Sequence, residues 1–159
     1  MQSYDPSSPW NLNYERALLG NILLCADADR QPKSGFEKVP PENYFLLDHQ
    51  QLAAALFEMF AAEIQPAGPI LYDWLLKKYP PARATELIAY ASSLSDGVPF
   101  LSPNYFYAGW INRHAAMRSV QRLQRQVGEA SPERVAQLEK KLAQALAEVP
   151  PEPSPKWPR

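Results

Sequence analysis

The stretch NLNYERALLGNILL, residues 11–24, decides the fold because it requires a helix that is covered on several sides. A charged pair precedes eight residues, of which only Gly20 and Asn21 are not apolar. A helix that is apolar nearly all round needs neighbouring segments to cover it. The apolar run at residues 17–26 is far shorter than the roughly 20 residues that cross a bilayer. We therefore predict that residues 14–25 form a helix that is packed on several sides and does not span a membrane.

The composition is that of an ordinary folded protein. The chain has 159 residues, enough for one core or for a small domain with an appendage. Its net charge of -1 produces no general attraction to nucleic acid or membranes. The single cysteine, Cys25, cannot form an internal disulfide, and the N-terminus lacks the pattern of a secretion signal. These features predict a cytoplasmic protein in which Cys25 is a small buried apolar group.

Prolines separate the apolar segments, and this punctuation predicts an all-α fold. No segment shows the alternation of a β-strand. After a loop at residues 27–41, a second helix is expected to begin at Asp48, capped by this residue together with Gln51. Two more helices are expected at residues 69–79 and 82–94. The side chains expected to face inward are Leu52, Ala55, Leu56, Met59, Phe60, Ile64, Ile70, Leu71, Trp74, Leu75, Leu87, Ile88, Ala91 and Leu94.

From Gly97 onward the pattern is that of two long helices. Ser102 and Pro103 form a strong helix start, and nothing stops this helix before Gly128. A second start at Ser131 follows after a short connection, which predicts an antiparallel hairpin. The expected organisation is a head of about four helices at residues 1–100, a hairpin at 101–149 and a Pro-rich linker or tail at 150–159.

Two helices bury only one seam between them, and the apolar residues of the hairpin exceed that seam. We expect the hairpin to pack against a second copy, as a dimer or a higher ring, or against the preceding domain. A plain intramolecular bundle is the alternative. The predicted oligomer interface comprises Phe106, Trp110, Met117, Val120, Leu123, Val135, Leu138 and Leu142.

The first hairpin helix is also basic, because no acidic residue occurs between Gly97 and Gly128. His114 shares one helix face with three of its arginines. This face can bind phosphate weakly, or it can meet acidic residues of the returning helix or of a partner. The three arginines on the face of His114 are Arg118, Arg122 and Arg125, and Arg113 is the fourth arginine considered for phosphate or acidic-partner contacts.

Motifs of catalysis are absent from the sequence. The two glycines closest in sequence, Gly97 and Gly109, are twelve positions apart, which excludes a phosphate-binding loop and a nucleophile elbow. One cysteine and two histidines do not make an ordinary zinc site. We expect His49 and His114 to lie at a helix surface or to be partly packed. The sequence predicts no catalytic residue, no cofactor and no metal, and therefore no enzyme activity.

Several stretches occur in an order that resembles the N-terminal domain of replicative DNA helicases of the DnaB type. Pro9 and Glu15 precede ALLGNILL, and PENYFLLDHQQLAAALFEMF follows with His49 before an apolar helix. GPILYDWL, TELIAYASSLSDGVPFLSPNYFYAGWI and AAMRSVQRL complete the series. The resemblance covers residues 9–127, and its order is more specific than any single motif.

This resemblance implies a helical head and hairpin that form a collar. In the family, hairpins pair between subunits, the pairs assemble into a three-fold ring, and the collar docks primase and influences loaders. The ATPase motor is a separate RecA-like domain, of which this sequence shows no motif. The leading hypothesis is a non-catalytic replication scaffold that self-associates and docks a primase, a loader or the helicase motor domain.

Two alternatives belong to other classes. A free-standing regulator, phage- or plasmid-like, would bind a replicative helicase. A DNA-binding module would use the face from Arg113 to Arg125, with binding that falls steeply with salt.

Overall fold

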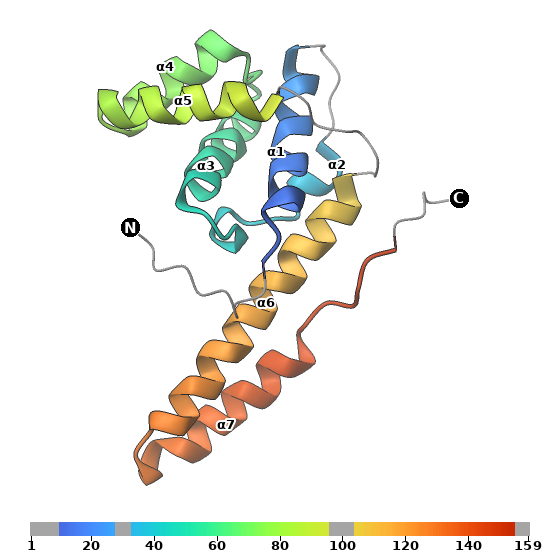
Figure 1. The fold of residues 1–159 in the computed structure, drawn as a ribbon, viewed down its shortest axis with the longest axis vertical. Helices are drawn as coiled ribbons and strands as arrows, with labels where there is room; N and C mark the ends of the chain where they lie inside the picture. Colours follow the sequence, from blue (N-terminus) through green and yellow to red (C-terminus); the bar gives the residue numbers. More distant parts are fainter. Residues whose placement is uncertain (1–9, 28–32, 96–103, 155–159) are drawn as a thin grey trace.

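The computed structural model describes residues 10–27, 33–95 and 104–154 (Figure 1). Within these ranges the chain forms helices and connecting segments without a β-strand, which confirms the all-α prediction. None of the helices described is long and apolar enough to cross a membrane. The helices are α1 (Leu12–Asp27), α2 (Lys33–Phe36), the 3-10 helix η1 (Pro41–Asn43), α3 (Leu47–Ala61), α4 (Gly68–Lys78), α5 (Pro81–Ser95), α6 (Asn104–Glu129) and α7 (Pro132–Ala147).

Helix α1 is the centre of the head, and it is packed on several sides as its sequence predicts. It packs against α3, α5 and α6, and in Figure 1 it lies between α3 and the start of α6. Leu18, Leu19 and Ile22 are completely buried. The apolar character of this helix on several sides is explained by neighbours on several sides. Burial of Cys25 stays a prediction, because its side chain lies outside the described residues, as do Ser102 and Pro103.

Most side chains expected to face inward from α3, α4 and α5 are buried or half-buried. Ile70 is the exception, because 45% of it is exposed in the first turn of α4. On that helix the buried positions are Leu71 and Leu75, one turn apart.

The segment expected to be a plain loop at residues 27–41 contains α2 and part of the core, so that prediction was wrong. Phe36 and Val39 are buried, and the Phe36 ring lies 5.6 Å from the ring of Phe57 on α3. Gly35 has a φ of 105°, and the backbone of α6 begins directly against it. The residues after α1 therefore fill the space between α3 and α6.

The start of α3 also differs from the prediction. Its N-cap is Leu46, and no side chain caps it. The Asp48 carboxylate instead accepts a hydrogen bond of 2.6 Å from Nη2 of Arg83, and Gln51 accepts one of 2.7 Å from Nε of the same residue. The guanidinium group of Arg83 on α5 thus binds the side chains of Asp48 and Gln51 and connects α3 to α5.

The last two helices form the antiparallel hairpin expected from the sequence. The first half of α6 packs against α1 and α2, and its second half projects from the head with α7 alongside (Figure 1). Val120 and Leu138 are buried. Because α6 belongs to the head and to the hairpin, the division of the chain into three parts stays a proposal.

Candidate functional site

An apolar groove on the hairpin is the main candidate site. It lies between the second half of α6 and the end of α7, and Leu146 at its edge is 52% exposed. Such a surface loses contact with water when a second apolar surface covers it. The groove is lined by Met117, Val120, Gln121, Gln124, Leu146 and Val149.

The residues predicted to form an oligomer interface divide into two groups. Phe106 and Trp110 are half-buried near the head, and their ring centroids lie 5.8 and 6.0 Å from the ring of Tyr14 on α1. The other six lie on the hairpin, where Val120 and Leu138 are buried and Met117, Leu123, Val135 and Leu142 are half-buried. The structure does not gather all eight on one surface.

The sequence reasoning placed Leu146 at the end of a self-associating segment, residues 135–146, but did not name it among the eight interface residues. It follows Leu142 by four positions, so the helical spacing that singled out Leu142 offered a signal for it. The structure makes it the most exposed large apolar side chain of the described residues.

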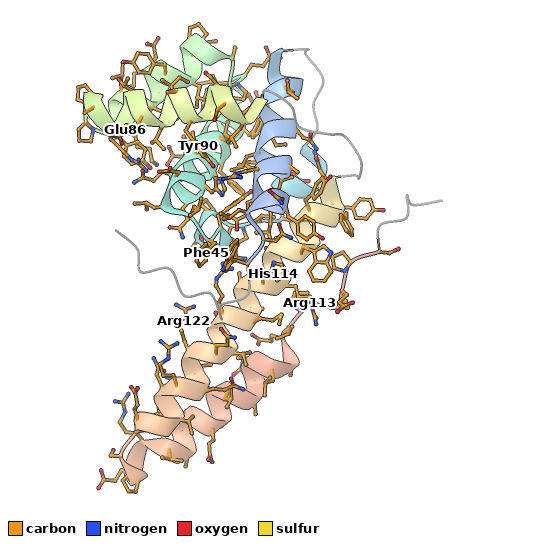
Figure 2. All side chains as sticks on the ribbon, in the orientation of Figure 1. Phe45, Glu86, Tyr90, Arg113, His114 and Arg122 are labelled. Atoms are coloured by element: carbon orange, nitrogen blue, oxygen red, sulfur yellow. The ribbon has the colours of Figure 1, made fainter. Side chains whose placement is uncertain are left out.

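The arginines of α6 do not form one continuous cationic face. Arg113 and Arg122 are nine positions apart, which is about half a turn out of phase on a helix, and they point to opposite sides of α6 in Figure 2. Arg118 donates a 2.7 Å hydrogen bond to the backbone oxygen of Asn43 and lies over the ring of Phe45.

The remaining cations of this helix lie farther from the head. Arg122 donates to Ser119 Oγ at 3.0 Å, and the side chains of Arg122 and Arg125 are exposed. Burial, and then the charge of Arg118, hold the pKa of His114 below its ordinary value. This histidine therefore adds little positive charge at neutral pH. Exposed positive charge is limited to a short part of the helix.

A buried polar network connects three helices of the head beside the hairpin. Oε1 of Glu15 on α1 lies 2.9 Å from Nδ1 of His49 on α3, and Nε2 of His49 lies 2.8 Å from the hydroxyl of Tyr90 on α5. The backbone N–H of Phe45 donates to both Glu15 oxygens at 3.0 and 3.1 Å. Figure 2 shows Phe45 and Tyr90 on either side of this part of the head.

Burial shows that this network is structural. Glu15 is 2% exposed and His49 is 0% exposed, so a substrate cannot reach them. The expectation that His49 lies at a surface or is partly packed was wrong, because the side chain is fully buried. Its burial is possible because Glu15 and Tyr90 satisfy both ring nitrogens. The only sequence signal for the contact between Glu15 and His49 was that both residues belong to the DnaB-like motifs. Among the described residues, no cluster of three or more potential metal ligands occurs.

A neighbouring tyrosine gives a matched pair of predictions. The Tyr44 hydroxyl is buried without a hydrogen-bond partner, and burial, followed by the charge of Glu15, raises its pKa well above the usual value. Tyr44→Phe is expected to raise the free energy of unfolding by about 1 kcal/mol, because it removes an unsatisfied polar group. Tyr90→Phe is expected to lower it by about 1–2 kcal/mol, because His49 loses a partner. Urea unfolding of both variants measures this, and equal losses in the two would contradict it.

The described residues define a class of fold, a helical head with a projecting antiparallel hairpin. This is the fold of the N-terminal domain of DnaB helicase. The crystal structure of that domain from Mycobacterium tuberculosis matches with a TM-score of 0.71 and 20% sequence identity, covering 90% of this chain and 100% of that chain. No protein-family model matches the sequence, and no curated protein matches it significantly. The resemblance deduced from the sequence is thus confirmed as a likeness of fold.

Proposed function

We propose that this chain is a non-catalytic scaffold of DNA replication, similar to the collar of a replicative helicase. It self-associates through its hairpin and offers a docking surface for a primase or a helicase loader in the cytoplasm. The observation that carries this proposal is the apolar groove on a hairpin of the DnaB N-terminal fold.

The groove supports pairing with a second copy for two reasons. It has half-buried and exposed apolar side chains, Met117 and Leu146, on the two helices that project from the head. Both signs of charge occur on the hairpin, with Arg122 on α6 and Glu139 on α7, and both side chains are exposed. In a two-fold pair the same patch of each copy is used, so every favourable contact occurs twice.

A DNA-binding role is not favoured by the structure. Arg113 and Arg118 are engaged by backbone oxygens of the chain itself. The cations that remain exposed are too few to provide strong sequence-independent attraction to phosphate.

Light scattering of the full chain tests the self-association. We expect the wild type to show a mass above that of the monomer, with an association that weakens at least 100-fold in Leu146→Glu. Burial of one leucine contributes about 1.5–3 kcal/mol, and a two-fold interface contains it twice. Leu146 is suited to this test because the fold of the single chain does not need it buried, whereas Leu138 is part of the seam.

Ile70→Glu is the matched control, because it places the same charge on a similarly exposed apolar position of α4. This variant should associate like the wild type. A wild type that stays monomeric at the highest soluble concentration would overturn the self-association. Titration with a purified primase or loader, followed by calorimetry, tests the docking, and absence of a complex would overturn that part alone.

A further inference from the structure

After α7 the chain continues along α6 in the direction of α7 as an extended segment, residues 150–154, which we call the strap. Figure 1 shows it running from the end of α7 towards the head. Nη1 of Arg113 donates a 2.6 Å hydrogen bond to the backbone oxygen of Pro150, and Nη2 lies 3.9 Å from Oε1 of Glu152. One guanidinium group therefore holds the strap at two points, as its planar fork of donors permits.

Gly109 provides a third point of contact. A Cβ atom at this position would lie 2.7 Å from Cγ and 3.0 Å from Cβ of Pro153. The proline ring thus occupies the space that a side chain would fill at any other residue type. Glycine inside a helix costs about 1 kcal/mol relative to alanine, and here it creates a notch on α6.

The spacing of the two partners is compatible. Gly109 and Arg113 are four positions apart and share one face of α6, with a rise of about 6 Å between them. Pro150 and Pro153 are three positions apart, which spans about 9 Å in an extended proline-rich segment. The length of the arginine side chain covers the difference.

The strap also loses little conformational entropy when it docks. Three of its five residues are proline, whose ring fixes φ and so reduces the freedom that is lost on docking. Proline has no N–H group, so few backbone donors of the strap require partners.

We propose that Gly109 and Arg113 form a docking site on α6 for an extended proline-rich segment, and that its ligand is the strap of the same chain. The notch at Gly109 accepts the ring of Pro153, and Arg113 binds a backbone carbonyl and a carboxylate. Docking keeps the chain running along α6 towards the head, and so fixes the direction in which it leaves the hairpin. This site is distinct from the groove, and the inference does not rest on the proposed function.

NMR relaxation of the labelled full chain tests the strap. Glu152 and Ser154 are its only residues with a backbone N–H group, so their amides report its order. In the wild type we expect order parameters near those of rigid backbone, about 0.85, and in Gly109→Ala values below about 0.6. Gly128→Ala is the matched control, because a Cβ at that helical position meets no atom within 4 Å.

A second variant makes the test independent of the new methyl group. Arg113→Gln is expected to release the strap as well, and Arg122→Gln, on the opposite side of α6, is expected to leave it ordered. The amide spectrum of α6 and α7 verifies that each variant is folded. Flexible strap amides in the wild type, or an ordered strap in either Gly109→Ala or Arg113→Gln, would overturn the proposal.

Discussion

Replacement of Glu15 by alanine is expected to lower the free energy of unfolding by about 3–5 kcal/mol. The variant leaves Nδ1 of His49 and the N–H of Phe45 buried without their acceptor. Each unsatisfied buried donor costs about 1–3 kcal/mol. The residue also joins α1 to α3, so the loss affects the packing of the whole head. Urea unfolding followed by circular dichroism measures it.

Glu15→Gln tests how much of this loss of stability is due to the charge of Glu15, and Glu42→Ala is the control for the loss of an exposed carboxylate. Glu15→Gln keeps one acceptor oxygen of similar shape, and a smaller loss is expected. Glu42→Ala removes an exposed carboxylate from η1 and should leave the unfolding midpoint nearly unchanged. A Glu15→Ala variant as stable as Glu42→Ala would contradict the structural role of the network.

The second large effect is expected for Gly35→Ala, which should lower the free energy of unfolding by about 2–4 kcal/mol. The φ of 105° at this residue is unfavourable for any L side chain. A Cβ would also lie 2.9 Å from the backbone of Asn104 and Tyr105, where α6 begins. Backbone strain and overpacking each cost about 1–3 kcal/mol.

Gly68→Ala is the control for this prediction, since a Cβ at the start of α4 meets nothing within 4 Å. It should unfold at or above the urea concentration of the wild type. Equal midpoints for Gly35→Ala and Gly68→Ala would show that α6 does not need the close approach at α2.

The helices and their order could be predicted because the evidence for them is local. Prolines and apolar periodicity identified α3, α4 and α5, and Ser131 with Pro132 predicted the start of α7. The hairpin followed from the short connection between two long amphipathic helices. The apolar circumference of α1 required neighbours on several sides, which the structure supplies.

The partners of individual side chains could not be predicted in the same way. Asp48 had the spacing of a helix cap, yet Arg83, 35 positions later, binds it. Phe106 and Trp110 continued an apolar stripe, yet Tyr14 covers part of their surface. An apolar stripe predicts that its side chains will be covered, but it does not identify the residues that cover them.

The sequence by itself determined the helical class, the packing of α1 on several sides and the hairpin, because helix formation and amphipathic burial depend on residues within a few turns. Only the tertiary structure decided that His49 is buried between Glu15 and Tyr90, that residues after α1 enter the core, and that the strap lies in the notch of Gly109. These contacts join residues that are far apart in the chain. Their geometry exists only after the helices have packed.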